Sequence, residues 1–189
     1  MTRLLAFAGS SRKASFNRQL LDLLVAMAQE AGADITTVDL AELDIPIYNG
    51  DLEAASGLPT GAEQFRSLLH DHQGLLIASP EYNGFVTPLL LNSIDWATRD
   101  GSGGADLTPF RGKTAAIVSA SPGQFGGLRS AGHLRTLLSG TGCHVLPMSL
   151  PVGSAGRAFD ESGKLKEERY QQRAEQLVSQ LIALTEKLA

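Results

Sequence analysis

Apolar runs and amphipathic stretches alternate along this chain. Residues 4–8 form a continuous apolar run that stops at a glycine and two serines, which is typical of a strand buried on both faces. Between residues 17 and 31, apolar side chains recur at intervals of three and four, and Gly32 follows as a stop signal. This spacing predicts an amphipathic helix directly after the first strand.

The same alternation continues to the end of the chain. We predict further strands at residues 35–40, 74–78, 114–119 and 145–148, and further helices at residues 61–71, 88–98, 128–138 and 161–188. Residues 41–60 are predicted to form a loop. Strands that alternate with helices require a parallel sheet with right-handed crossovers and helices on both faces. With no repeat or linker, we expect a single α/β domain over residues 1–189.

Two of these helices carry more specific signals. Thr87 stands where a helix cap is expected, and Pro88 follows at the first turn. In the last helix, four leucines share one stripe that we expect to pack on the sheet: Leu177, Leu181, Leu184 and Leu188.

Composition narrows the range of partners. The formal net charge of −4 gives no broad attraction to nucleic acid or to anionic lipid, so we expect neither as a partner. Cys143 is the only cysteine, which excludes an intrachain disulfide and a cysteine-only zinc site, and the four histidines are scattered, so we assign no metal. No apolar window approaches the length of a membrane span or a secretory leader. We expect a cytoplasmic protein.

The loop after the first strand suits a phosphate. In parallel sheets, ligands bind outside the carboxyl ends of the strands. Here residues 9–17 supply hydroxyls, backbone N–H groups, the guanidinium of Arg12 and the positive end of a helix dipole. The loop matches neither the triphosphate-binding pattern nor the dinucleotide fingerprint, so a monoester such as that of FMN fits better. An ordinary capped turn would explain the same residues.

The loops after the third and fourth strands suit a flat ring. In residues 79–88, Tyr82 offers an apolar face and Asn83 offers amide donors and an acceptor. In residues 119–127, glycines allow the backbone to approach a ligand closely, and Ser119, Ser121 and Gln124 could reach the ring. A buried tyrosine in a turn and a sharp entry to the next helix are the structural alternatives.

Taken together, these loops resemble the NADPH-dependent FMN reductase family, a flavodoxin-like group that includes quinone, azo-dye and chromate reductases. The most specific stretch is Pro80-Glu81-Tyr82-Asn83-Gly84, continuing through Pro88, Asn92, Asp95, Trp96 and Arg99. The resemblance implies a three-layer α/β/α sandwich with a five-stranded parallel sheet in the order 2-1-3-4-5. It also implies FMN as the cofactor and NADPH or NADH as the electron donor.

By this resemblance, two groups of residues would hold FMN. The phosphate would lie against the first loop, at Ser10, Arg12, Ser15, Phe16 and Asn17. The isoalloxazine ring would be lined by Pro80, Glu81, Tyr82, Asn83, Gly84, Ser119, Ser121 and Gly123. Family members form homodimers or homotetramers in which the helix of Asn92, Asp95, Trp96 and Arg99 lies at or near a subunit contact, and the partner completes the pocket.

The predicted activity is ping-pong electron transfer from reduced nicotinamide, through FMN, to a small acceptor such as a quinone, an azo compound, a flavin or an oxidised metal. The cofactor supplies the chemistry, so no side chain is assigned a catalytic role. Arg99 or Arg129 could contact the nucleotide's phosphates, and Asp95 and Arg99 could form an ion pair within their helix. An FMN-binding electron carrier or redox sensor is the alternative. A third hypothesis is an FMN-free α/β domain that binds another phosphate-bearing ligand or only a protein partner.

Overall fold

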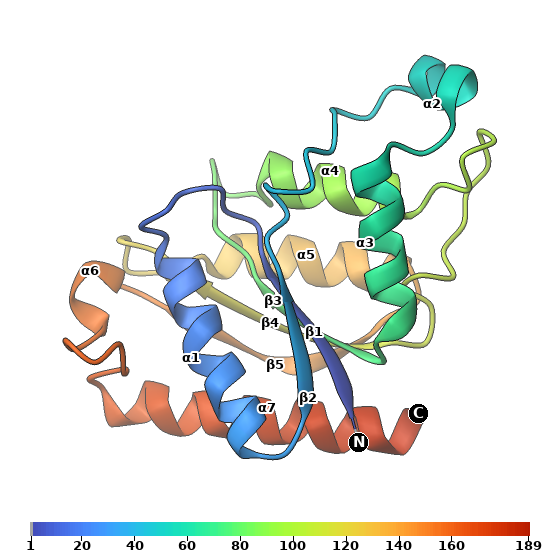
Figure 1. Cartoon of the computed structure of the whole chain (residues 1–189). Helices are drawn as coiled ribbons and strands as arrows, with labels where there is room; N and C mark the ends of the chain where they lie inside the picture. Colours follow the sequence, from blue (N-terminus) through green and yellow to red (C-terminus); the bar gives the residue numbers. More distant parts are fainter. Residues whose placement is uncertain (1) are drawn as a thin grey trace.

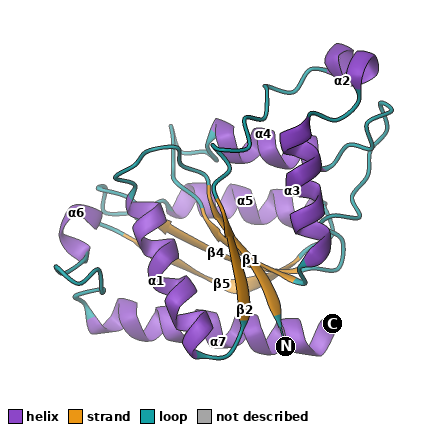
Figure 2. Cartoon of the chain, in the orientation of Figure 1, coloured by secondary structure: helices purple, strands orange, loops and turns teal. Residues whose placement is uncertain are grey.

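The computed structural model describes residues 2–189 and has a five-stranded parallel sheet at its centre (Figures 1 and 2). The order is β2-β1-β3-β4-β5, as the family resemblance implies. The strands are β1 (Arg3–Ala8), β2 (Asp34–Val38), β3 (Gly74–Ala78), β4 (Thr114–Ala120) and β5 (His144–Val152). Every residue of the central strands β3 and β4 is buried, which explains their continuous apolar sequences.

Helices cover both faces of the sheet, so the predicted three-layer architecture is confirmed. One hydrophobic cluster joins the sheet to α1 (Phe16–Glu30) and α7 (Glu168–Leu188). The other joins it to α3 (Thr60–Asp71), α4 (Pro88–Ala97) and α5 (Leu128–Gly140). All parallel strands end at the same edge of the sheet, and the loops that leave this carboxyl edge lie together (Figure 2).

Two expectations for the helices were wrong. Residues 41–60 are not only loop, because they contain α2 (Gly50–Ser56), which protrudes from the body of the fold (Figure 1). The last helix begins at Glu168, not at residue 161. In the turn before it, the carboxylate of Asp160 accepts hydrogen bonds from the backbone of Ser162 and Lys164, at 2.8 and 2.9 Å, which favours the turn over helix.

The leucine stripe of the last helix is only partly confirmed. Leu177 and Leu181 are buried, whereas Leu188 is 48% exposed. The side that packs on the sheet is made instead by Ala174, Leu177, Val178, Leu181 and Thr185. Within residues 2–189, no helix combines the length and the apolar character needed to cross a bilayer.

The fifth strand is longer than predicted. It runs to Val152 and includes Pro147 and Pro151. Proline is tolerated because β5 is an edge strand, where a missing backbone donor on the open side breaks no ladder bond. The extension carries the chain to the carboxyl edge, where the short helix α6 (Ala155–Ala158) follows.

Candidate functional site at the carboxyl edge of the sheet

The first loop, residues 9–17 after β1, presents polar groups that make few hydrogen bonds or ion pairs with residues 2–189. Ser15 is the N-cap of α1, and its hydroxyl accepts a hydrogen bond from the backbone of Arg18 at 3.3 Å. Ser10 is buried and accepts from the backbone of Arg12. The Arg12 side chain is exposed and forms no ion pair with any residue in the 2–189 range. A free cation beside a helix N-terminus is suited to an anion.

Asn17 has a different arrangement from its neighbours in this loop. Its side-chain amide donates to the carbonyl of Ala120 at 2.8 Å, and its amide oxygen accepts from the backbone N–H of Ala120 at 2.9 Å. Both bonds are buried. The Asn17 side chain therefore ties the start of α1 to the end of β4 and fixes the first loop relative to the third.

The second loop, residues 79–88 after β3, is held to α5 by Glu81. The Glu81 carboxylate pairs with the guanidinium of Arg129, at 2.6 and 2.9 Å, and accepts from the backbone N–H groups of Arg129 and Ser130. Burial works to raise the pKa of Glu81, but the hydrogen bonds from Arg129 and Ser130 outweigh it and hold the pKa below its usual value. Glu81 thus faces α5, and only its backbone is available to line a ring.

A tight hairpin follows Glu81. Tyr82 and Phe85 exchange both backbone hydrogen bonds, at 3.1 and 3.0 Å, across Asn83 and Gly84. Asn83 and Gly84 have φ values of 53° and 79°, which identify the two-residue turn that Asn-Gly favours. The side chains of Tyr82 and Phe85 are 47% and 46% exposed at the carboxyl edge. The hairpin therefore presents two half-exposed aromatic side chains, and the ring of Phe85 packs against the ring of His133 with their centroids 4.5 Å apart.

The third loop, residues 119–127 at the end of β4, is held in place by the end of β5 and the residues after it. The backbone N–H of Ser121 donates to the carbonyl of Val152, and the N–H of Ala155 donates back to Ser121. The hydroxyl of Ser121 accepts from the backbone of Gly123. Residues 152–155 are a part of this edge that was not predicted, because the fifth strand was expected to end at residue 148 and runs to Val152.

Ser119 lies beneath this loop with its hydroxyl unpaired. The residue is fully buried, and its Oγ has no hydrogen-bond partner among residues 2–189. Gly127 covers it: a Cβ there would lie 2.8 Å from the Cβ of Ser119, and Gly127 has a φ of 86°. An unpaired buried hydroxyl is costly unless another molecule satisfies it, so it marks a place for a polar atom of water or ligand.

Hydrogen bonds between the loops hold the predicted residues together at the carboxyl edge of the sheet. The hydroxyl of Thr87 donates to the carbonyl of Gly9 at 2.7 Å, joining the first and second loops. Thr87 is the N-cap residue of α4, as predicted, but its side chain makes this bond to Gly9 and no capping bond within the helix. Ser79 and Ser130 share a hydroxyl hydrogen bond of 2.8 Å, and Ser130 also donates to the carbonyl of Pro80.

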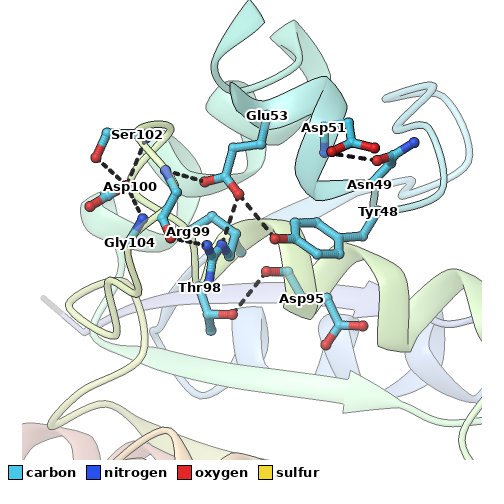
Figure 3. A network of polar contacts seen from close by, with 12 residues as sticks. Tyr48, Asn49, Asp51, Glu53, Asp95, Thr98, Arg99, Asp100, Ser102 and Gly104 are labelled. Carbon is cyan, nitrogen blue, oxygen red and sulfur yellow. Dashed lines mark hydrogen bonds and ion pairs between the residues drawn. The ribbon is translucent and has the colours of Figure 1, made fainter. Parts of the chain in front are cut away.

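A second polar network joins the α2 arm, which we define as residues 41–59, to residues 98–104 (Figure 3). The fully buried carboxylate of Glu53 accepts from the Nε of Arg99 and the hydroxyl of Tyr48, both at 3.0 Å. Burial works to raise the pKa of Glu53, and the bonds from Arg99 and Tyr48 outweigh it and lower the pKa. Arg99 thus pairs with Glu53 across the fold, not with Asp95 in its own helix.

The remaining polar candidates are explained by packing. Trp96 is fully buried, and its indole N–H donates to the carbonyl of Pro46 at 2.8 Å. Cys143 is buried, as predicted, and burial raises the pKa of its thiol to about 11, so the thiol is unreactive at neutral pH. Over residues 2–189, no group of three His, Cys, Asp or Glu side chains is arranged to hold a metal.

With this geometry in place, comparison with known proteins decides the family. The family described as NADPH-dependent FMN reductase matches residues 2–157, which is most of the chain. The chain belongs to this family. Membership confirms the predicted enzyme class, an NAD(P)H-dependent oxidoreductase of the FMN reductase and quinone reductase type, with FMN and a nicotinamide nucleotide as its cofactors.

Individual members of the family cover nearly the whole chain. An NAD(P)H-dependent FMN reductase of Pseudomonas aeruginosa is 34% identical over 183 residues, covering 95% of this chain and 92% of its own. An NADPH:quinone oxidoreductase of Arabidopsis thaliana is 35% identical and covers 100% and 94%. Among solved structures, a flavoenzyme NAD(P)H:(acceptor) oxidoreductase of Paracoccus denitrificans superimposes with a TM-score of 0.80 at 26% identity, covering 100% and 99%.

Proposed function

We propose that this FMN reductase family member holds the FMN phosphate in the first loop, between Arg12 and the N-terminus of α1. The observation that carries this assignment is the free, exposed guanidinium of Arg12 next to a helix end capped by Ser15. A phosphate there would accept hydrogen bonds from Arg12, from the hydroxyls of Ser10 and Ser15 and from the backbone at Phe16 and Asn17. The side chain of Asn17 keeps its structural role.

We assign the ring of FMN to the second and third loops. The backbone of Pro80 to Gly84 supplies N–H and C=O groups, and the aromatic face of Tyr82 borders them. On the other side, Ser121 and Gly123 supply polar atoms, and the hydroxyl of Ser119 lies buried beneath them. This donor set fits a flat heteroaromatic group whose edge carries nitrogen and oxygen atoms, since the loops offer mostly backbone groups at fixed positions.

The overall reaction transfers two electrons in two half-reactions at one place. NADPH or NADH gives up a hydride, which is two electrons and one proton, and leaves as the oxidised nucleotide. FMN supplies the chemistry that accepts this hydride and releases the electrons to a second substrate. A quinone acceptor takes two electrons and two protons and becomes a hydroquinone, with the second proton coming from solvent. No side chain of this chain has to transfer a proton.

We propose a quinone as the acceptor class. The plant relative is named an NADPH:quinone oxidoreductase, and the half-exposed rings of Tyr82 and Phe85 offer apolar surface in the second loop. Azo compounds, free flavin and oxidised metals remain outcomes of the same assay. The cytoplasmic location, the homodimer or homotetramer and the lack of nucleic acid partners stay predictions.

Steady-state kinetics test the ping-pong proposal. Initial rates measured over a grid of NADPH and quinone concentrations should give parallel double-reciprocal lines, because the two substrates use the same site in turn. Lines that intersect would show that both bind at once and would refute the mechanism. An enzyme that bleaches with NADPH but passes its electrons only to a protein partner would favour the electron-carrier alternative.

A further inference from the structure

Most of the exposed large apolar side chains of this protein lie at the carboxyl edge of the sheet. Seven such side chains are exposed among residues 2–189, and four of them come from the second loop, the third loop and the start of α5: Tyr82, Phe85, Phe125 and Leu128. The proposed ring site uses Tyr82. It makes no use of the other three, which we call the apolar rim. Exposed apolar side chains grouped in this way mark a binding surface.

Contacts with α5 bring the apolar rim to one place. Leu128 is the first residue of α5, and its backbone N–H donates to the carbonyl of Phe125 at 3.1 Å. Phe85 reaches the same helix from the second loop, where its ring packs against that of His133. The rim therefore borders the proposed ring site from both of the loops that form it.

The backbone around Phe125 is held in place, although the side chain is 70% exposed. The backbone N–H of Ser154 donates to the carbonyl of Gly123 at 3.1 Å, and the N–H of Gly126 donates to the same carbonyl at 3.3 Å. Gly126 packs so closely on the end of β5 that a Cβ there would lie 2.7 Å from the backbone of Val152. Phe125 is thus presented on a fixed loop, and a ligand that contacts it has little backbone to order.

The rim lies in a part of the edge that offers no free charge of its own. Residues 82–94 and 114–128 contain no charged side chain. Arg129, the next residue, is paired with Glu81 at 2.6 Å. The phosphates of a nicotinamide nucleotide are bound best by free cations. The occupant that suits the rim is therefore uncharged and apolar.

We propose that the apolar rim binds the alkyl or isoprenoid tail of a quinone acceptor while the quinone head lies at the FMN ring. This inference rests on the proposed quinone reductase function and narrows its acceptor to quinones that carry an apolar tail. The head has to reach FMN to take up electrons, so its tail leaves the site across the neighbouring surface. A tail that lies on Phe85, Phe125 and Leu128 removes apolar surface of both partners from water.

Two quinones with the same dimethoxy methyl benzoquinone ring, one without a tail and one with a decyl tail, test the proposal in the FMN-loaded protein. With NADPH as the donor, we expect the wild-type kcat/KM to be at least about tenfold higher for the tailed quinone, a factor that burial of about two methylene groups supplies. In Phe125→Ser/Leu128→Ser, this preference should fall to within about twofold. Leu188→Ser removes a leucine of similar exposure from the end of α7 and should keep the wild-type preference.

Binding without turnover provides the second measurement. Isothermal titration of the two corresponding hydroquinones, which are the reaction products, into the oxidised protein should show at least about tenfold tighter binding of the tailed one to wild type. The Phe125→Ser/Leu128→Ser protein should bind the two with similar affinity. Anaerobic bleaching by NADPH is measured on every variant, so that a failure of the proposed reductase function appears there and not as a changed preference for the tail.

Three results would overturn the proposal. The first is a wild type that treats the two quinones and the two hydroquinones alike, whether or not NADPH bleaches its flavin. The second is a Phe125→Ser/Leu128→Ser protein that keeps the wild-type preference, because the tail then binds elsewhere. The third is a rise in the KM for NADPH in that variant with the preference for the tail unchanged, which would assign the rim to the nucleotide.

Discussion

The first and second loops at the carboxyl edge are built in opposite ways. In the first loop, residues 11–14 are exposed, and the charged group of Arg12 has no ionic partner within the described chain. In the second loop, the carboxylate of Glu81 takes part in four hydrogen bonds, and the carbonyl of Pro80 is tied to Ser130. Both loops are assigned to the same cofactor.

The difference separates two tasks. A phosphate carries its own charge and hydrogen-bond acceptors, so a loop that binds it can leave its donors free until it arrives. A ring is recognised by backbone groups at its edge, and these must already stand at the correct positions, because ordering them on binding would weaken affinity. Substitutions in the first loop should therefore act mainly on FMN affinity, and substitutions around the second and third loops mainly on stability.

The largest stability effect is expected at Gly127, which joins the third loop to α5. In Gly127→Ala, the new methyl group would lie 2.8 Å from Ser119 at a backbone conformation that L residues rarely adopt. Urea denaturation should show the free energy of unfolding reduced by about 2–4 kcal/mol. The matched variant Gly132→Ala, within α5 and with open space around it, should gain about 0.5–1 kcal/mol. Equal stability of the two variants would contradict this account of the loop.

Removing Arg12 should give the largest effect on FMN affinity. Arg12→Ala should raise the dissociation constant for FMN about 10- to 100-fold, because a charge-assisted hydrogen bond to the phosphate is lost. The free energy of unfolding of the FMN-free protein should change by less than about 0.5 kcal/mol.

Riboflavin, which lacks the phosphate, provides the control for this variant. Fluorescence titration should give the same riboflavin affinity in wild type and in Arg12→Ala. Arg111→Ala, which removes an equal charge from an exposed position far from the first loop, should bind FMN as the wild type does. A similar loss for both flavins would place the phosphate elsewhere.

Neutralising Glu81 should lower stability in a pH-dependent manner. Glu81→Gln loses the ion pair with Arg129, and we expect the free energy of unfolding at neutral pH to fall by about 1–2 kcal/mol. Because the pKa of Glu81 is lowered by folding, its contribution is complete above the usual value of 4.5 and disappears as the pH falls through the folded pKa.

The free energies of unfolding of wild type and Glu81→Gln, plotted against pH, should therefore converge once the pH is below the pKa of Glu81 in the folded protein. Glu63→Gln, at an exposed position in the first turn of α3, supplies a control with little effect at any pH. A constant difference between wild type and Glu81→Gln down to strongly acidic pH would show that the charge of Glu81 is not what holds the loop.

The smallest effect is expected at the cap of α1. Ser15→Ala removes the acceptor for the backbone N–H of Arg18 and should lower the free energy of unfolding by about 0.5–1 kcal/mol. Ser11→Ala, at an exposed neighbouring position, should leave stability unchanged. Thermal unfolding of the FMN-free proteins measures both, and a cap effect as large as that of Gly127→Ala would remove the contrast between the loops.

The fold could be predicted from the sequence where burial is strong and local. The run before Gly9 and residues 74–78 are apolar throughout because both faces of their strands are covered. The seven-residue helix α2 was missed because it is short and buries little apolar surface, although Asn49 at its N-cap and Gly57 at its C-cap are typical boundary signals of a helix. It is stabilised by Glu53, whose partner Arg99 lies 46 residues away.

The candidate site could be predicted as loops but not as side-chain contacts. The rule that ligands bind at the carboxyl edge correctly brings Ser10, Glu81 and Ser121 to one edge of the sheet. It does not reveal that Asn17 turns towards Ala120 or that Glu81 turns towards Arg129, since those partners are 103 and 48 residues distant. Local spacing carries no information about such pairs, which depend on how the helices pack.

We expect FMN bound at this edge to take electrons from a nicotinamide nucleotide and to give them to a small acceptor. Anaerobic stopped-flow mixing of the FMN-loaded protein with NADPH, and separately with NADH, tests it most directly. At least one nucleotide should bleach the visible flavin absorbance as fast as the enzyme turns over, and a quinone added afterwards should restore that absorbance. Bound FMN that neither nucleotide bleaches at such a rate would contradict the claim.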